Sequence, residues 1–357
     1  MTANKNKALF TRQLLKWNAD LNKRPMPWKG EKDPYKIWLS EIILQQTRVE
    51  QGWNYYNRFV TTFPTVHELA KAPETKVFKL WEGLGYYTRC KNLIATAKII
   101  AKEKKGVFPN SYEEILKLKG IGPYTAAAIA SFAFDLPFAV VDGNVFRVLA
   151  RYFGIDKPID SNEGKKIFSS LADELLYKQH PGIYNQALMD FGAVVCKPKL
   201  PACSTCPLKK SCVAYLNGSV NDLPVKEKKI IKRTRWLYYL LIQSDHTIAV
   251  KKRGAKDIWE NLYEFVLIEE PARTTVKKIL LHKAFKTLMG KEKYIVKDIS
   301  EVYKQQLTHQ TIYGQFIKIN VSNNYSPKGY EMLPIVKIKK LAFPKFITSY
   351  LETISFS

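Results

Sequence analysis

The sequence predicts a multidomain chain, with a mainly helical region over residues 1–216 and a smaller α+β domain over residues 236–357. The chain has 357 residues, which is more than one compact core of ordinary size contains. Across residues 8–216, apolar side chains recur every three or four positions, as they do in amphipathic helices. From Trp236 onward, aromatic and β-branched residues alternate instead, which is typical of strands.

The helical region is divided into segments by clusters of turn-forming residues, such as Gly-Val-Phe-Pro-Asn-Ser at 106–111. No internal repeat of solenoid length is present in the sequence. The segments that we expect to be helical are 36–60, 92–102, 112–118, 123–133, 144–153 and 164–177.

A basic linker is expected between the two regions, over residues 217–235. It opens with turn formers, and its second half, residues 226–235, is densely basic, so we expect it also to lie along a phosphate backbone. After the linker, residues 236–242 and 247–250 are expected to form strands.

The composition is that of a globular protein with a polyanionic partner. Hydrophobic residues make up 46% of the chain and aromatic residues 13%, which excludes a disordered chain. The formal net charge of +25 favours nucleic acid, because Lys and Arg release counterions from phosphates. Charge alone leaves open a basic protein from a lysine-rich proteome. There is no secretory signal and no stretch long enough for a membrane span, so we expect an intracellular, cytoplasmic protein.

Four of the five cysteines form a cluster that predicts a metal site. Cys196, Cys203, Cys206 and Cys212 are separated by six, two and five residues, whereas Cys90 stands alone and is expected to be a plain thiol. Zinc also accepts four sulfurs, but its sites usually pair two short Cys-x-x-Cys turns. One such pair and two single cysteines favour an iron–sulfur cubane. Lysines that decorate these loops, and that we expect to face phosphates, are Lys197, Lys199, Lys209 and Lys210.

The segment from Leu118 to Ala126 predicts a phosphate-binding turn between two helices. Gly120 and Gly122 allow backbone N–H groups to approach a phosphate closely, and Pro123 suits the first position of the following helix. The helix N-terminus adds partial positive charge. A Gly-x-Gly turn by itself is more typical of a simple helical hairpin, but the Thr-Ala helix that follows it favours phosphate binding.

Glu41 is a candidate general acid. On a helix its face would be largely apolar, so burial should raise the pKa of its carboxyl towards neutrality, as a general acid requires. If the helix turned otherwise, Glu41 would be a surface residue. The expected neighbours on its face are Ile37, Trp38, Leu44 and Gln45.

Asp142 is the second candidate carboxylate. It follows an apolar run and precedes a helix expected to begin near Asn144, so it could be an N-cap. It could also be an ionised carboxylate beside a developing positive charge. The two roles are compatible, because a capping aspartate is held ionised and fixed in place.

Together these motifs resemble the endonuclease III superfamily of helix–hairpin–helix DNA glycosylases, and most closely its adenine-specific, MutY-type branch. They occur in the family's order between residues 24 and 212. The matching stretches are 27–28 (Pro-Trp), 34–41 (Pro-Tyr-Lys-Ile-Trp-Leu-Ser-Glu), 44–47 (Leu-Gln-Gln-Thr), 83–87 (Gly-Leu-Gly-Tyr-Tyr), the Gly-x-Gly hairpin, 141–145 (Val-Asp-Gly-Asn-Val), 186–190 (Gln-Ala-Leu-Met-Asp) and the cysteine cluster.

The resemblance implies a fold and a chemistry. A six-helix barrel would span about 29–135, and a [4Fe-4S] module would comprise the N-terminal helix and 136–216. The enzyme would flip an adenine paired with 8-oxoguanine or guanine out of duplex DNA. Glu41 would protonate the adenine at N7 and later serve as base, Asp142 would stabilise the oxocarbenium-like sugar or briefly bond to it, and Asn144 would orient Asp142 or the sugar.

The resemblance also assigns DNA contacts. Arg24, Trp28 and Val49 would line the adenine pocket. Gln46 and Tyr86 would enter the DNA helix near the opposing base, with Leu44 as an apolar wedge. The full set of expected DNA-contacting residues is Arg24, Trp28, Leu44, Gln46, Thr47, Val49, Tyr86, Gly120, Gly122, Thr308 and His309.

Tyr124 indicates a monofunctional enzyme. Bifunctional relatives carry a lysine at this position, two residues after the second glycine of the hairpin, that forms a Schiff base and nicks the strand. Tyrosine cannot do so, and Lys119 is on the wrong side of the turn.

Residues 236–357 resemble the Nudix-like (MutT-like) domain that reads 8-oxoguanine in MutY-type enzymes. Residues 259–265 are similar to the family's Leu-Trp-x-x-Leu-Tyr-x-Phe segment, and 307–309 match its Phe-Ser-His loop, with Thr308 in place of serine and His309 retained. The signature of nucleotide-hydrolysing relatives is absent, so this domain should recognise a lesion without hydrolysing a nucleotide. The expected partner is duplex DNA bound by a monomer near the bacterial nucleoid.

Two alternatives remain. An endonuclease III-like lyase would act on oxidised pyrimidines, and Tyr124 and the long C-terminal region argue against it. A non-enzymatic iron–sulfur DNA-binding protein would lack the carboxylates, whereas Glu41 and Asp142 both occupy matched positions.

Overall fold

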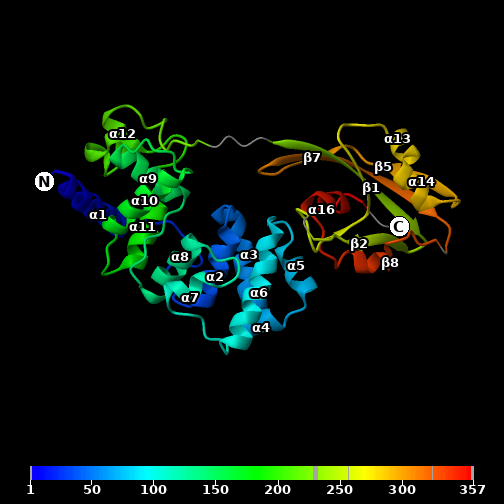
Figure 1. Ribbon diagram of the computed structural model, residues 1–357, viewed down its shortest axis with the longest axis horizontal. Coiled ribbons are helices and arrows are strands. Elements are labelled where there is room, and N and C mark those ends of the chain that lie inside the picture. Colours follow the sequence, from blue (N-terminus) through cyan, green and yellow to red (C-terminus); the bar gives the residue numbers. More distant parts are fainter. Residues whose placement is uncertain (1, 228–231, 256, 324, 355–357) are drawn as a thin grey trace. The chain divides into compact units, whose positions relative to one another are not determined.

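The computed structural model describes residues 2–227, 232–255, 257–323 and 325–354 (Figure 1). The chain divides into two compact units. The first comprises Met1–Lys71 and Asn92–Lys229, and the second Ala72–Lys91 and Ile230–Ser357. Residues 72–91 therefore belong to the same unit as the C-terminal residues, although the barrel was expected to include them.

The described part of the first unit is helical and contains no strand, as the sequence predicts. Its helix α6 begins at Tyr87, within the second unit. The elements are α1 (Thr2–Leu21), α2 (Pro34–Leu44), α3 (Val49–Thr62), α4 (Val66–Lys71), α6 (Tyr87–Glu103), α7 (Tyr112–Leu116), α8 (Pro123–Phe134), α9 (Gly143–Phe153), α10 (Asn162–Leu175), α11 (Pro181–Val194), the short 3-10 helices η1 (Cys203–Thr205) and η2 (Lys209–Ser211), and α12 (Val213–Leu216).

The expectation of one helical segment over 36–60 needs correction. The segment contains two helices, α2 and α3, and Gln46 between them has a backbone φ of +56°. Helix α2 has already ended at Leu44, with Gln45 as its C-cap, and a left-handed residue such as Gln46 cannot continue a right-handed helix. The apolar periodicity on both sides concealed the break.

The core of the first unit lies where α1, α9, α10 and α11 meet. Phe10, Leu149, Phe168 and Phe191 are buried there with many other apolar side chains. Helix α2 packs against α3 and α8, and α11 packs against α8 and α9. This packing brings the start of α9 and the start of α8 to the same region as the end of α2.

The expected linker over 217–235 is structured in part. Leu223 and Val225 pack against the core of the first unit, and the Ile159 amide donates to the Val225 carbonyl at 3.1 Å. Residues 228–231 lie outside the described residues. Arg233 already begins a strand.

The second unit is built on a mixed sheet, in agreement with the α+β prediction. The strand order is β3-β2-β1-β7-β5, with β4 also paired to β1, β6 to β7 and β8 to β2; β1 and β7 are parallel. Its elements are α5 (Glu74–Trp81), β1 (Arg233–Ser244), β2 (Thr247–Lys252), β3 (Tyr263–Glu264), β4 (Val266–Glu270), α13 (Val276–Leu281), α14 (Lys283–Met289), β5 (Tyr294–Ile299), β6 (Tyr303–Gln306), β7 (Gln310–Val321), β8 (Glu331–Pro334), α15 (Ile335–Ile338) and α16 (Lys345–Leu351).

Successive side chains of each strand point to opposite faces of the sheet, so each face has its own apolar core. Tyr238 and Leu240 of β1 point to α13 and α14, which supply Ile279 and Phe285. On the opposite face, Phe316 of β7 stacks on Tyr350 of α16 with ring centroids 4.0 Å apart.

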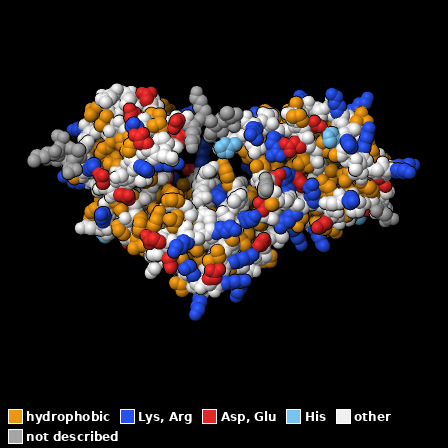
Figure 2. All heavy atoms as spheres, viewed as in Figure 1, with side chains coloured by type: hydrophobic (Ala, Val, Ile, Leu, Met, Phe, Trp, Pro, Cys, Tyr) orange, Lys and Arg blue, Asp and Glu red, His pale blue; other side chains and the backbone are white. Residues whose placement is uncertain are grey.

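Lys and Arg side chains are spread widely over the face of the molecule shown in Figure 2, in keeping with the net charge of +25. Among the described residues, no helix has the length and apolar character needed to cross a membrane.

Candidate active site

Glu41 is placed by α2, a helix whose sequence is almost entirely apolar. Asp33 caps the helix by accepting the Tyr35 amide at 2.9 Å, and Pro34 occupies its first turn. Seven other residues of α2 are buried, and Glu41 itself is only 6% exposed. The expectation that its helix face is buried is therefore confirmed.

Burial raises the pKa of the Glu41 carboxyl to about 7. The negative charge of Asp142 acts in the same direction, while a hydrogen bond from the Tyr124 hydroxyl opposes it. A carboxyl with this pKa carries its proton over part of the neutral range. It can therefore donate that proton to a bound group near pH 7.

Tyr124 owes its position to the hairpin turn that precedes α8. It is the second residue of that helix, after Pro123, and its hydroxyl donates to Glu41. Burial raises the pKa of the Tyr124 phenol well above its ordinary value, so it remains a hydrogen-bond donor. A phenol at this position offers no amine for a Schiff base.

Asp142 is the N-cap of α9, as one of the two sequence interpretations proposed. Its Oδ1 accepts the amides of Asn144 at 2.8 Å and Val145 at 2.7 Å, and its Oδ2 accepts the Asn144 side-chain amide at 2.7 Å. These bonds fix the carboxyl group in orientation. Burial nevertheless outweighs them and raises the pKa of Asp142 from its ordinary value, in the direction opposite to that expected of a capping aspartate.

Arg147 is a residue of this site that the sequence reasoning missed. Its guanidinium donates to the Asn144 side-chain oxygen at 2.8 Å, and through Asn144 it supports Asp142. The same side chain donates to the carbonyls of Cys196 and Gly192, each at 2.7 Å. One buried arginine therefore connects the first cysteine of the cluster with the carboxylate site.

Glu41 contributes to the walls of two cavities. The first has a volume of about 230 Å³, and its walls include Trp28 and Gln186. The second has a volume of about 500 Å³, and its walls include Tyr124 and Asp142. A carboxyl that reaches both spaces can act on a group that occupies either one.

Four of the predicted DNA-contacting residues lie in these walls. Trp28 is buried in the first cavity, and Leu44, Gln46 and Gly122 line the second. Gln46 is exposed in the turn between α2 and α3, where its backbone is left-handed.

Three others are not among the described residues that line these cavities. Thr47 and Val49 are half-buried in the turn and first residue of α3, and neither is among the described residues that line the two cavities. Arg24 is also absent from both walls. It lies in the segment after α1, where its guanidinium donates to Asp190 at 2.9 Å.

Asp190 organises a polar network that the sequence reasoning did not assign. Its carboxylate is fully buried and accepts hydrogen bonds from Asn22 and Arg24 at 2.9 Å, Gln186 at 3.0 Å and Lys29 at 3.3 Å. The available signal was the spacing of two polar residues four positions apart within apolar helix α11, which places Gln186 and Asp190 on one face. Through this network, Asp190 orients Gln186 in the wall of the first cavity.

The hairpin turn has the geometry that a phosphate site requires. Gly120 has a φ of +79°, and a Cβ there would lie 2.6 Å from the Asn92 Cβ, so only glycine fits. Around Gly122, the N-cap of α8, a Cβ would meet no atom within 4 Å, which leaves the backbone open to an approaching anion. Phosphate binding at this turn remains a prediction.

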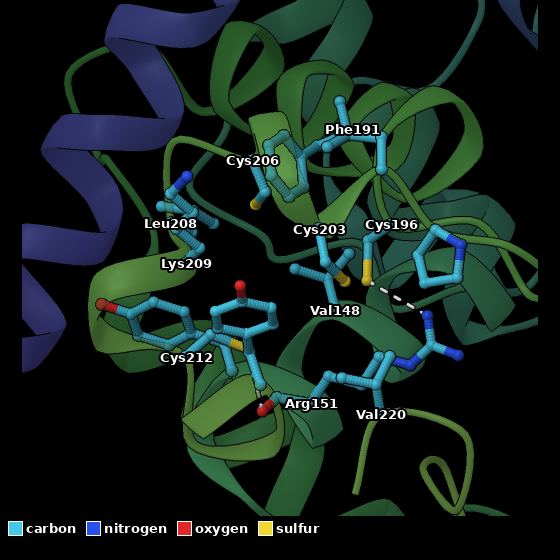
Figure 3. A pocket seen from close by; sticks show the side chains of 15 residues that line it. Val148, Arg151, Phe191, Cys196, Cys203, Cys206, Leu208, Lys209, Cys212 and Val220 are labelled. Atoms are coloured by element: carbon cyan, nitrogen blue, oxygen red, sulfur yellow. Dashed lines mark hydrogen bonds between the residues drawn. The ribbon is translucent and has the colours of Figure 1, made fainter. Parts of the chain in front are cut away.

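The four clustered cysteines lie around one cavity, shown in Figure 3. Arg151 donates to the Cys196 sulfur at 3.4 Å and to the Lys197 carbonyl at 2.8 Å, so it ties the loop to α9. Among the described residues, no three Cys, His, Asp or Glu side chains converge on the position of a single ion. The cysteines that share the cavity are Cys196, Cys203, Cys206 and Cys212.

The remaining predicted residues lie in the second unit. Thr308 and His309 are exposed at the tip of the hairpin between β6 and β7. Tyr86 is 42% exposed in the turn before α6, and its hydroxyl forms a short hydrogen bond with that of Thr308.

Comparisons with known proteins agree with this arrangement. Residues 39–173 match the model of the HhH-GPD superfamily of base excision DNA repair proteins, and residues 237–353 match that of the NUDIX domain. A solved structure described as a thermostable thymine-DNA glycosylase superimposes with a TM-score of 0.57 at 30% identity, covering 61% of this chain and all of that one. The helical fold and these matches thus define a base-excision DNA glycosylase.

Two curated relatives from Buchnera aphidicola, both named adenine DNA glycosylase, identify the branch. One is 40% identical over 72% of this chain and 73% of its own length, and the other is 34% identical over 88% of each. The chain belongs to the adenine DNA glycosylase family, whose members hydrolyse N-glycosyl bonds.

Proposed function

We propose that this enzyme removes adenine paired with 8-oxoguanine or guanine from duplex DNA, after flipping the adenine out of the base stack. The observation that carries the proposal is Glu41, a buried carboxyl with a pKa of about 7 that reaches two adjoining cavities. Removal of a purine requires an acid that can protonate the departing base at neutral pH. A carboxyl with an ordinary pKa would have lost that proton.

The two cavities suit the two parts of a flipped nucleotide. The first offers the Trp28 ring and the Gln186 amide to an aromatic base with hydrogen-bonding edges. The second contains Asp142 and the backbone of Gly122, which suit a sugar cation and its phosphate. Glu41, in the walls of both, would then face the bond between base and sugar.

The chemical steps follow from these positions. Glu41 donates its proton to N7 of the adenine, and the glycosidic bond breaks as its electron pair leaves with the base. Asp142 stabilises the oxocarbenium-like sugar, and water adds to the sugar carbon with Glu41 as the base. Asn144 and Arg147 hold Asp142 in the required orientation.

We further propose that the enzyme is monofunctional, because Tyr124 replaces the lysine that forms a Schiff base. Borohydride treatment on substrate DNA should therefore trap little protein. Efficient trapping of the wild type, and its loss in Lys119→Met, would overturn this assignment by identifying Lys119 as the amine.

The cysteine cavity fits a [4Fe-4S] cluster. Four thiolates are the ligand set that such a cluster requires, and all four line one cavity. Their spacing, with one Cys-x-x-Cys pair and two single cysteines, favours a cluster over zinc. When bound, the cluster would cross-link the four cysteines and so hold in place the loops that carry Lys197, Lys199, Lys209 and Lys210. Cys203→Ser should lower bound iron and sulfide, whereas Cys90→Ser should not; a zinc content of one per chain would contradict the assignment.

A single-turnover excision assay tests the proposed substrate. It compares duplexes with adenine opposite 8-oxoguanine, guanine and thymine, with G:T and thymine-glycol duplexes as further arms. The G:T arm is included because the similar solved structure is described as a thymine-DNA glycosylase. We expect the fastest release of adenine opposite 8-oxoguanine. Release of thymine or thymine glycol in place of adenine would overturn the proposal.

A further inference from the structure

The turn that carries Tyr86 has an unusual backbone. It connects α5 to α6, and Gly83, Gly85 and Tyr86 all have positive φ angles, of +94°, +72° and +47°. Glycine adopts this conformation readily, but a tyrosine is strained in it and keeps it only where surrounding contacts impose it. The conformation leaves the Tyr86 ring 42% exposed.

Arg89 provides those contacts. Its guanidinium lies 5.5 Å from the centroid of the Tyr86 ring and 5.3 Å from that of Trp81. It also donates to the carbonyls of Leu84 at 3.5 Å and Gly85 at 3.4 Å. One planar cation thus meets two rings and two carbonyls of the same turn, an arrangement that lysine cannot reproduce.

The rest of the turn is rigid around this cation. The Trp81 indole donates to the Gly85 carbonyl at 3.0 Å, and the Arg89 amide donates to the Tyr86 carbonyl at 2.9 Å. Burial lowers the pKa of Arg89 to about 10, which still leaves the side chain charged at neutral pH.

The segment is also anchored within the second unit. Glu82 accepts the Phe343 amide at 2.9 Å, and Lys91 pairs with Glu260 at 2.5 Å. The exposed tip of the turn therefore has a defined position, in which the Tyr86 hydroxyl meets Thr308. Thr308 is the hydroxyl expected to contact the base opposite the adenine.

We propose that Arg89 is a positioning residue for opposing-base recognition, which holds Tyr86 in its left-handed conformation so that the ring and hydroxyl meet the base opposite the adenine. The inference rests on the proposed function, because it assigns a role within that reaction. Arg89 touches neither the substrate base nor the reacting atoms. Its effect should therefore appear in the choice of opposing base and only through Tyr86.

The test measures single-turnover rates of adenine release opposite 8-oxoguanine and opposite guanine, for the full-length protein. In Arg89→Met, we expect the ratio of the two rates to fall about tenfold, as expected for the loss of one cation–ring contact and its carbonyl hydrogen bonds. Arg89→Lys keeps the charge but lacks the planar group that meets both rings and both carbonyls, so its ratio should fall nearly as far as that of Arg89→Met. Circular dichroism and a thermal melt establish that each variant is folded.

A matched control and a double-mutant cycle separate positioning from general structure. Arg58 also lies on an aromatic ring, 4.6 Å from the Tyr55 centroid, and Arg58→Met should leave the ratio unchanged. In a Tyr86→Ala background, Arg89→Met should have no further effect on the ratio. With 2-aminopurine beside the opposing base, wild-type binding should raise its fluorescence by unstacking it, and Arg89→Met should abolish the rise.

Several results would overturn the inference. An unchanged ratio in Arg89→Met, with wild type active on both duplexes, removes the role of Arg89 and leaves the proposed function standing. If Arg89→Met lowers the ratio of the two rates equally in the wild type and in Tyr86→Ala, Arg89 does not act through Tyr86. A folded wild type that releases no adenine from either duplex removes both proposals.

Discussion

The carboxylate site and the hairpin tip at Thr308 are built in opposite ways. Glu41 is 6% exposed and Asp142 is held by three hydrogen bonds, so both carboxyl groups have fixed positions among buried neighbours. Thr308 and His309 are exposed at the end of two strands. Under the proposed function, the chemistry would depend on desolvation and fixed geometry, whereas recognition would depend on exposed groups that the DNA can reach.

That difference predicts that substitutions in the two regions affect the excision rate in different ways. A change at the buried site should alter the rate for every duplex, because it acts on the bond that breaks. A change at the exposed site should alter mainly the choice between duplexes.

Replacement of Glu41 should have the largest effect. Glu41→Gln keeps the size and burial of the side chain but removes the acid, so we expect excision to fall by about a thousandfold or more on every duplex. DNA affinity, measured by fluorescence anisotropy, should remain near that of the wild type. Unchanged turnover in this variant would exclude Glu41 as the acid.

Arg147→Met should be the next most damaging. The substitution removes the donor that holds the Asn144 oxygen, so Asp142 loses its support and the rate should fall by about 10- to 100-fold on all duplexes. Iron content should be determined on the same samples. Arg151→Met is the matched control, because Arg151 donates to the Cys196 sulfur and should affect iron more than rate. A rate loss that merely follows iron loss would show that Arg147 acts on the cluster loop alone.

Arg147 also shows where the sequence stops being informative. The pattern of α2 predicts that Glu41 is buried, because its neighbours on the helix are close in sequence. The partners of Arg147 are at Asn144 and at Cys196, and the second lies 49 positions away in the chain. No local pattern encodes a contact made by packing α9 on α11, so a buried arginine on a helix gave no signal of its role.

The same distinction accounts for other outcomes. The cap at Asp142 follows from local chemistry and was predicted, but its raised pKa depends on burial by distant segments and was not. The break at Gln46 was missed because the helices on both sides share one apolar periodicity. The cysteine spacing predicted a metal site, and the structure places the four cysteines around one cavity, because η1, η2 and short loops keep them close together.

The pH dependence of excision should report on Glu41. A general acid must be protonated, and the pKa of Glu41 is about 7, so the single-turnover rate should be level below that pH. Above it, the rate should fall by about tenfold for each pH unit. The decline should be the same for duplexes with 8-oxoguanine and with guanine, since it arises at the buried site. A pH profile that is flat from 6 to 9 would rule out Glu41 as the rate-determining acid.

Replacement of Glu41 by Gln should raise the stability of the protein at pH 8, although it lowers the rate of excision. The folded-state pKa of Glu41 is raised from 4.5 to about 7, so the unfolded chain loses the proton first as pH rises, and stability is lost across that window. The cost at pH 8 is about 3 kcal/mol, taken from the shift at 1.4 kcal/mol per unit. Glu41→Gln should therefore unfold at higher urea concentration than the wild type at pH 8 and lose this advantage near pH 4.5. Equal urea midpoints at pH 8 would show that burial of the carboxyl costs little.

Thr308→Val should have the smallest effect and the most selective one. Valine keeps the branched shape of threonine but removes the hydroxyl that meets Tyr86, so one exposed hydrogen bond is lost. We expect the rate opposite 8-oxoguanine to fall by about three- to tenfold while the rate opposite guanine changes by less than twofold. Thr308→Ser keeps the hydroxyl and should retain the preference. If Thr308→Val instead slowed both duplexes equally, the hairpin tip would contribute to catalysis or general binding, and the division between a buried chemical site and an exposed recognition site would fail.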